Sequence, residues 1–321
     1  MSKLKTIVIL QAAIIIILLI YPLYLYRPQE KITNNKGLLS PRVYAGVLDQ
    51  KSYLITNFQP LKNELMEDMG NNNLSIHVEN LRDGASFDIN DEKKFPPLSL
   101  NKVPLAILVM QKVESGKLNL NTLIPIKDEL KDAYFGDLYN NPSKELPLRF
   151  LMEKMLSESD NTAFFVLLEY LDKRDLKLLL EYYPIDFKYY YNPEIGHQTT
   201  YLTTKEVSNV FRSLYLSTLL NAKNSEYLLG LLENETYDIK NKSKLPDDVR
   251  VVHKFGLNYV NQNKYLHDCG IMYIPLSSRI LYCIMTDGLE KEDAHQKIGT
   301  AINKIYGYIV ETRDELSKYR G

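Results

Sequence analysis

Residues 95–110, FPPLSLNKVPLAILVM, separate two parts of the chain that have different hydrophobic patterns. Before this segment, residues 74–78 alternate like a β-strand, and residues 85–89 can pair back as a second strand across a turn at residues 82–84. After it, the chain is predicted to be entirely helical from residue 103 to about residue 220. The segment therefore marks the boundary between a sheet and a helical part.

The remaining regions complete the sheet. Strand character returns at Val249–His253, and two alternating runs at residues 267–274 and 279–286, joined by a short turn, are typical of a β-hairpin. Helical spacing over Tyr53–Met69 and an apolar face from Ile298 to Ile309 place a helix at each end. This order predicts an α/β (α+β) fold: an antiparallel five-stranded sheet flanked by N- and C-terminal helices, with an all-helical lobe beside it.

Local patterns within the helical part support this interpretation. Leu148, Leu151, Met152 and Met155 follow the spacing of one helix face. Residues 203–206, Thr-Thr-Lys-Glu, fit a capping box and predict a helix that starts at Thr203.

The two cysteines, Cys269 and Cys283, lie one on each strand of the predicted hairpin. Because these positions are nearly opposite each other, a disulfide between them is sterically conceivable. A pair of small, buried apolar side chains also explains the pattern, and we favour this second interpretation.

The composition excludes several classes of protein. The 321 residues include 39 Lys and Arg, 40 Asp and Glu, and 45% hydrophobic residues, so the chain is neither disordered nor collagen-like. A net charge of −1 provides no basic surface of the kind that nucleic acids require. Residues 1–31 carry four basic side chains and one acidic one, so the rest of the chain has a net charge of −4.

Residues 7–26, IVILQAAIIIILLIYPLYLY, contain no charge and could span about 30 Å of bilayer core as a helix. Two lysines precede the run, which favours a cytoplasmic N-terminus and an extracytoplasmic main domain, although Arg27 and Lys31 weaken this bias. A cleaved signal peptide is the alternative, but its apolar region would be shorter and end in small residues. We predict a transmembrane anchor at residues 1–31, a linker at 32–45 and one domain at 46–321.

Ser99 and Lys102 are the first candidates for chemistry. At the start of a helix, residues three apart share a face, so the Lys102 amine can lie against the Ser99 hydroxyl. A lysine desolvated at the mouth of an apolar pocket can have the lowered pKa that activation of a serine needs. The alternative is an ordinary helix cap beside a surface lysine.

Two further elements follow along the chain. Ser159-Asp160-Asn161 lies at a junction between two predicted helices, where a hydroxyl can relay a proton and an amide can bind a substrate; helix capping is the alternative role. His253-Lys254-Phe255-Gly256 ends a predicted strand, where Lys254 can attract a carboxylate and Gly256 permits close backbone approach.

Together and in this order, the three elements resemble the S-x-x-K, S-D-N and K-T-G signatures of the serine β-lactamase and penicillin-binding family. The resemblance runs from about Tyr53 to Tyr308 and is strongest to class A β-lactamases. It implies a two-lobed serine acyl-transfer enzyme with its cleft between the sheet and the helical lobe.

The resemblance also implies residue roles. Ser99 is the expected nucleophile, Lys102 its base and Ser159 the proton donor to the leaving nitrogen. Asn161 is expected to bind the substrate amide and Lys254 the substrate carboxylate. Gly256 and Leu257 are expected to contact the substrate, and the N–H groups of Ser99 and Leu257 would form the oxyanion hole. This chemistry needs no metal or cofactor, and the five histidines have no metal-ligand spacing.

Two departures from the family pattern affect the expected chemistry. The third motif reads Lys-Phe-Gly, so the hydroxyl that the family places beside the substrate carboxylate is absent, and Leu257 replaces the residue often found after the glycine. No E-x-x-L-N motif, which supplies the deacylating glutamate in class A enzymes, lies between Ser159 and Lys254. Glu194 is the one plausible substitute.

Three functions remain after these departures. The first is an anchored serine hydrolase of the class A type that opens β-lactam rings. The second is a D-alanyl-D-alanine carboxypeptidase or penicillin-binding protein that acts on peptidoglycan stem peptides. The segment Asn192–Gly196 resembles a sequence stretch of these carboxypeptidases. The third is a β-lactam-binding sensor without turnover, which Phe255 favours. All three predict a bacterial cell envelope location and a small-molecule or peptide partner, with no nucleic acid.

Overall fold

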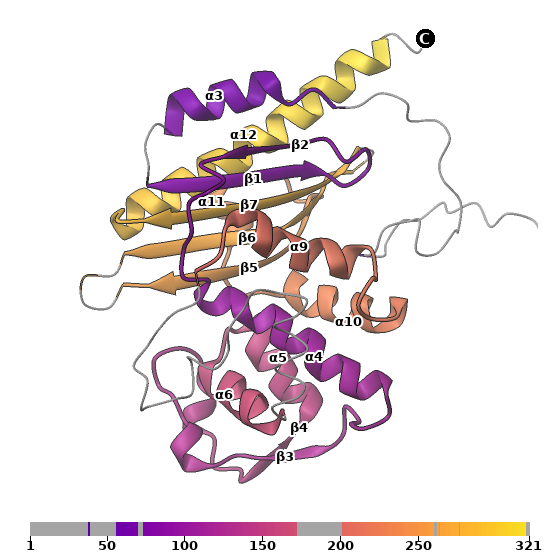
Figure 1. Ribbon diagram of the computed structural model, residues 1–321, viewed down its shortest axis with the longest axis vertical. Helices are drawn as coiled ribbons and strands as arrows, with labels where there is room; N and C mark the ends of the chain where they lie inside the picture. Colours follow the sequence, from indigo (N-terminus) through magenta and orange to yellow (C-terminus); the bar gives the residue numbers. More distant parts are fainter. Residues whose placement is uncertain are drawn as a thin grey trace, which may run out of the picture. The chain divides into compact units, whose positions relative to one another are not determined.

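The sheet has five antiparallel strands in the order β2-β1-β7-β6-β5 (Figure 1). The computed structural model describes residues 38, 56–69, 73–171, 201–259, 262, 264–275 and 277–318. The strands are β1 (Leu74–Asn80), β2 (Ser86–Ile89), β5 (Arg250–Asn258), β6 (Tyr265–Tyr273) and β7 (Arg279–Asp287). The predicted fold class, the N-terminal strand pair and the C-terminal hairpin are confirmed.

Helices cover both faces of the sheet. Helices α3 (Gln59–Met69) and α12 (Lys291–Lys318) pack on one face, where Ile298, Ile302 and Ile305 join a core shared with the strands. Helix α9 (Thr204–Tyr215) packs on the other face, against β1, β6 and β7. The two apolar faces arise because side chains alternate along each strand. Strand β5 forms one edge of the sheet, next to the helical lobe (Figure 1).

The helical lobe contains several helices and one small sheet. Its longer helices are α4 (Lys102–Glu114), α5 (Leu148–Ser157), α6 (Asn161–Tyr170) and α10 (Ala222–Glu233), and the short α11 (Ile239–Lys242) follows α10. Short 3-10 helices occur at Leu98–Asn101, Asp128–Leu130 and Leu138–Asn140. The prediction of an entirely helical segment was wrong at β3 (Leu123–Pro125) and β4 (Glu145–Pro147), which pair antiparallel. Strands of three residues are too short to produce a recognisable alternation.

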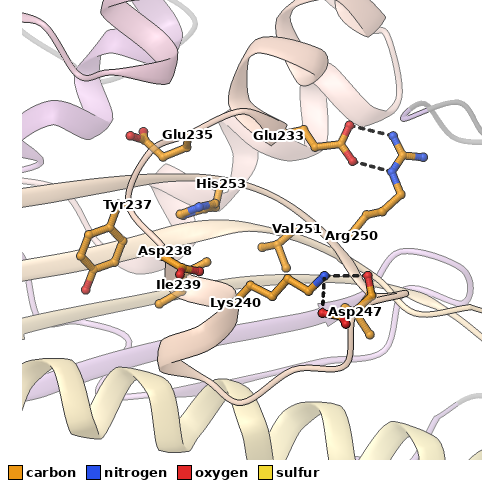
Figure 2. A pocket seen from close by; sticks show the side chains of 11 residues that line it. Glu233, Glu235, Tyr237, Asp238, Ile239, Lys240, Asp247, Arg250, Val251 and His253 are labelled. Atoms are coloured by element: carbon orange, nitrogen blue, oxygen red, sulfur yellow. Dashed lines mark hydrogen bonds and ion pairs between the residues drawn. The ribbon is translucent and has the colours of Figure 1, made fainter.

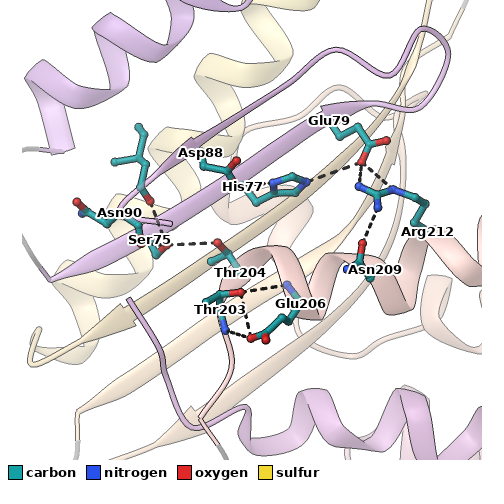
Figure 3. A network of polar contacts seen from close by, with 11 residues as sticks. Ser75, His77, Glu79, Asp88, Asn90, Thr203, Thr204, Glu206, Asn209 and Arg212 are labelled. Atoms are coloured by element: carbon teal, nitrogen blue, oxygen red, sulfur yellow. Dashed lines mark hydrogen bonds and ion pairs between the residues drawn. The ribbon is translucent and has the colours of Figure 1, made fainter. Parts of the chain in front are cut away.

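The predicted capping box at the start of α9 is confirmed. The Glu206 N–H donates to Thr203 Oγ1 at 3.2 Å, and the Thr203 N–H donates to Glu206 Oε2 at 2.8 Å (Figure 3). Further along α9, Arg212 Nε donates to Glu79 Oε2 on β1 at 2.8 Å. The capping box therefore fixes the start of the helix, and the contact between Arg212 and Glu79 joins the helix to the sheet.

A buried histidine lies beside this ion pair. His77 Nδ1 is 2.7 Å from Asp88 Oδ1, and its Nε2 is 3.8 Å from Glu79 Oε2 (Figure 3). Burial opposes the charged form, but the hydrogen bond to Asp88 and the negative charges of Asp88 and Glu79 outweigh it and raise the pKa of His77. The same contacts lower the pKa of both carboxyls, which burial alone would raise.

The raised pKa of His77 predicts a pH-dependent stability. The stabilisation from the charged imidazole is fully present below its unfolded pKa of about 6.5 and is lost as pH rises through the higher folded pKa. Urea unfolding between pH 5 and 9 should therefore show the wild-type protein losing stability relative to His77→Gln as pH rises. A stability difference between the two proteins that does not change with pH would contradict this expectation.

The two cysteines form a disulfide across β6 and β7, where Cys269 and Cys283 are register partners. The favoured interpretation of two unlinked apolar side chains was therefore wrong. Both residues are fully buried and belong to the core on the helical-lobe face of the sheet. The sequence pattern located the pair correctly because each strand alternates, but it contained no information on the oxidation state.

Gly270 lies on β6 opposite His253 on β5, at a position with no room for a side chain. A Cβ atom there would lie 2.2 Å from Val252 O and 2.6 Å from His253 Cβ. We expect Gly270→Ala to lower the free energy of unfolding by about 1–3 kcal/mol, because the strands must move apart. The matched control is Gly230→Ala in α10, where the added methyl meets nothing within 4 Å. This control should raise stability by about 0.5–1 kcal/mol in the same urea titration; equal effects at both positions would refute the steric argument.

Within the described ranges, no helix is both long enough and apolar enough to cross a membrane. The predicted span at residues 7–26 lies outside those ranges, as do residues 1–31 and most of the predicted linker.

Candidate active site

Ser99 lies in the short helical turn Leu98–Asn101, immediately before α4. Leu98 precedes it with φ of 54°, in the left-handed region that a branched aliphatic residue rarely adopts. The segment before this turn is anchored, because Phe95 exchanges two backbone hydrogen bonds of 2.8 Å with Leu202. Such an over-determined backbone can hold a strained conformation, which is typical of functional sites.

His267 supports the same segment, a role that no sequence motif indicated. Burial lowers its pKa to about 4, so the imidazole is neutral at physiological pH. Its Nδ1 accepts the Thr286 N–H at 3.2 Å, which makes Nε2 the donor to Pro96 O at 2.9 Å. The histidine thereby ties the residues before Ser99 to strand β6.

Lys102 is the first residue of α4 and is buried. Its ammonium donates to Ser159 O, to Ser159 Oγ at 3.3 Å and to Asn161 Oδ1 at 2.8 Å. Among the described residues, its hydrogen bonds go to this segment and not to the Ser99 hydroxyl. Burial, followed by the nearby charge of Lys254, holds the pKa of Lys102 well below its usual value.

The Ser159-Asp160-Asn161 segment lies between α5 and α6, as predicted. Ser159 has φ of 56°, and Asp160 accepts the Ala163 N–H and the Leu138 N–H, each at 2.8 Å. Asp160 therefore has the capping role, while Ser159 and Asn161 face Lys102. Asn161 Nδ2 also donates to Asp132 Oδ1 at 3.0 Å, which orients the amide.

Lys254 lies on β5, which continues to Asn258 rather than ending at the motif. Its side chain is 0% exposed and forms an ion pair with Glu235, whose side chain is also 0% exposed. The positive charge of Lys254 also helps to lower the pKa of Lys102. Three segments, which carry Ser99 and Lys102, Ser159 and Asn161, and Lys254, thus meet at the boundary between sheet and helical lobe.

Comparisons with known proteins identify the family of this chain. The profile of a family described as the beta-lactamase enzyme family matches residues 59–309. The chain belongs to this family.

Individual relatives are distant in sequence. Beta-lactamase VEB-1 of Pseudomonas aeruginosa is 24% identical over 258 residues, which cover 73% of this chain and 84% of VEB-1. The structure of PBP-A has a TM-score of 0.69 at 17% identity and covers 79% of this chain and 97% of its own. A mutant of PBP-A in an acyl-enzyme complex with penicillin G has a TM-score of 0.68 at 17% identity, with 78% and 97% coverage.

Phe255, where the beta-lactamase family has threonine, is buried against aromatic rings from other segments. Its ring centroid lies 4.7 Å from that of Tyr237, in a stacked arrangement, and 5.4 Å from that of Phe135. The Lys254 ammonium lies 4.2 Å from the centre of the Phe255 ring. The ring therefore occupies a position beside Lys254 that the family motif leaves to a small side chain.

Gly256 and Leu257 follow on the same strand, beside the Ser99 turn. A Cβ atom at Gly256 would lie 3.2 Å from both Leu98 Cβ and Pro97 O, so glycine permits the close approach that the sequence predicted. Leu257 is partly exposed and pairs with Leu266. The prediction that its N–H contributes to an oxyanion hole remains a prediction.

A hollow of about 310 Å³ lies at the start of β5 (Figure 2). It is lined by the last residue of α10, by the segment between α10 and β5 and by the first residues of β5, including Glu233, Glu235, Tyr237, Arg250 and His253. Arg250 Nη2 donates to Glu233 Oε2 at 2.8 Å. Glu235 lies farther from Arg250, on the side of the hollow where Tyr237 is located (Figure 2).

Glu235 is the main site residue that sequence reasoning missed. It is 19 residues from Lys254 and belongs to no motif, so only the fold brings the two together. Burial raises the pKa of Glu235 and lowers that of Lys254, as expected for a desolvated pair. Glu194 lies outside the described residues. Within the described part of the chain, no group of His, Cys, Asp and Glu side chains is arranged to hold a metal ion.

Proposed function

We propose that the protein is a membrane-anchored serine hydrolase that opens β-lactam rings through an acyl-enzyme on Ser99. The observation that carries this proposal is the convergence of Ser159 and Asn161 on the Lys102 ammonium at the start of the helix that follows Ser99. Family membership and the penicillin G adduct of a structural neighbour support the same type of substrate.

In the proposed reaction, neutral Lys102 accepts the proton of Ser99 as the serine oxygen attacks the lactam carbonyl carbon. The carbon–nitrogen bond then breaks, and Ser159 delivers a proton to the leaving nitrogen. Asn161 holds the substrate amide, and the N–H groups of Ser99 and Leu257 stabilise the oxyanion, each contributing about 3 kcal/mol. Water then hydrolyses the ester; Glu194 is the candidate base for this step.

The missing E-x-x-L-N motif favours a second candidate, a D,D-peptidase of the penicillin-binding type. This enzyme would acylate in the same way but retain β-lactam adducts for longer. The buried Phe255 is the observation that favours the third candidate, a sensor that does not turn over.

The proposed location is the outer face of the cytoplasmic membrane, with residues 7–26 as the anchor. The disulfide between Cys269 and Cys283 supports this location, because such bonds persist mainly in oxidising compartments.

The test uses the full chain in detergent, mixed with penicillin G and followed by intact mass over time. A transient adduct with steady loss of the β-lactam supports the hydrolase, whereas a persistent adduct supports the peptidase or the sensor. Cleavage of a stem peptide ending in D-alanyl-D-alanine then identifies the peptidase. The absence of any adduct, with penicillin G or its methyl ester, would refute acyl-enzyme formation.

A further inference from the structure

The Lys254 ammonium already has an anionic partner. Its ion pair with Glu235 is completely buried, with both side chains 0% exposed. One carboxylate oxygen, Glu235 Oε1, has no hydrogen-bond partner among the described atoms. The pair is therefore close to neutral as a unit, and it carries no excess positive charge toward a bound ligand.

The Phe255 ring shields the same ammonium. It lies 4.2 Å from Lys254 Nζ and is itself 4% exposed. Its position is fixed by Tyr237, which stacks between Phe255 and His295, and by Phe135. Phe135 also accepts the Asn161 N–H through its backbone carbonyl at 3.0 Å, so the residue that packs on the Phe255 ring is hydrogen-bonded to the segment that carries Asn161.

A substrate carboxylate would meet two obstacles here. It would have to displace an apolar ring to reach Lys254, and it would then bring a second negative charge close to Glu235 in a buried site. Burying a charge without its own partner is unfavourable, and like charges in close contact repel. A substrate with a neutral group at this position meets neither electrostatic cost.

We propose that Glu235 and Phe255 make this site select acyl substrates that have a neutral group where family substrates have a carboxylate. This inference rests on the proposed acylation of Ser99 and specifies its substrate class. Glu235 and Phe255 act on specificity, and neither takes part in bond breaking.

The experiment measures second-order acylation rates of the full-length protein with penicillin G and with penicillin G methyl ester, by intact mass. The adduct mass shows that the lactam opened and that the methyl group remains. For the wild-type protein we expect the ester to react at least as fast as the acid. A hydrogen bond to a charged group typically corresponds to a factor of about 10 to 100 in binding. Glu235→Gln should therefore raise the acid-to-ester rate ratio by about tenfold or more.

Matched variants distinguish the effect of the Glu235 charge from the steric effect of the Phe255 ring. Glu233→Gln makes the same chemical change two residues away, at the end of α10, but Glu233 pairs with Arg250, so the rate ratio should remain that of the wild type. Phe255→Thr should raise the ratio by opening access to Lys254. If Phe255→Thr does not fold, the nearly isosteric Glu235→Gln and the wild-type ratio still decide the question.

The outcomes are distinct. A wild-type protein that prefers the acid by tenfold or more overturns the inference, as does a ratio that Glu235→Gln leaves unchanged. A Glu233→Gln variant that raises the ratio as much as Glu235→Gln overturns the assigned role of Glu235. If neither compound forms an adduct, the proposed acylation of Ser99 is refuted. If adducts form but the acid reacts faster by tenfold or more, only the specificity inference is refuted.

Discussion

Ser99→Ala should abolish covalent labelling by penicillin G and by its methyl ester, at every time and concentration at which the wild-type protein is labelled. The substitution removes the oxygen that attacks the lactam carbonyl carbon in the proposed acylation step. It should leave the fold intact, because Ser99 is partly exposed and its alanine replacement adds no atoms to the turn Leu98–Asn101. The measurement is intact mass after prolonged incubation, with thermal unfolding to verify the fold.

Ser115→Ala provides the matched control for this prediction. Ser115 lies at the other end of α4, is exposed, and donates from Oγ to Lys112 O at 3.1 Å. The variant should be labelled at the wild-type rate. Labelling that persists in Ser99→Ala would refute the assignment of the nucleophile, and peptide mapping of the residual adduct would identify the residue that reacted.

The order of strands and helices along the chain could be predicted because strands and helices have different periodicities, whereas the order of the strands within the sheet follows only from the structure. Strands β1, β6 and β7 are long enough for alternation to appear, and the helix that starts at Thr203 has a local capping signal. Strands β3 and β4 have three residues each, so the same reasoning failed for them. The local sequence pattern was thus enough to predict the longer strands and the capped helix, whereas β3 and β4 become apparent only from their pairing in the structure.

The candidate site could be predicted only in part, for a similar reason. Ser99 and Lys102 are three residues apart, and Ser159 and Asn161 two apart, so short motifs revealed them. Glu235, Phe135 and Tyr237 act on Lys254 and Phe255 across the fold, and no spacing in the sequence encodes such contacts. The substitution in the Lys-Phe-Gly motif was visible, but the buried ion pair behind it was not.

The capping role of Asp160 illustrates how two interpretations of one motif can both hold. Asp160 caps α6 through the Ala163 N–H, as an acidic residue before a helix usually does. This cap fixes the backbone between Ser159 and Asn161, so that both side chains reach the Lys102 ammonium. The structural role of the middle residue therefore positions the two that are proposed to act on the substrate.

Lys102→Met should reduce the second-order rate of acylation by about 10²–10⁴-fold, the usual contribution of a positioned general base. Methionine approximates the length of the lysine side chain and keeps the apolar packing at the start of α4, but it cannot accept a proton. Lys112→Met, near the end of the same helix, is the control and should keep the wild-type rate.

The pH profile gives this prediction a second, independent test. Because burial holds the pKa of Lys102 well below 10.5, the wild-type rate should rise with pH through that lowered pKa and level off before pH 10.5. The sign follows from the mechanism, since only the unprotonated amine can accept the Ser99 proton. In Lys102→Met this rise should disappear, leaving a slow rate that does not follow the lysine titration. A variant that keeps both the wild-type rate and its pH dependence would show that another group activates Ser99.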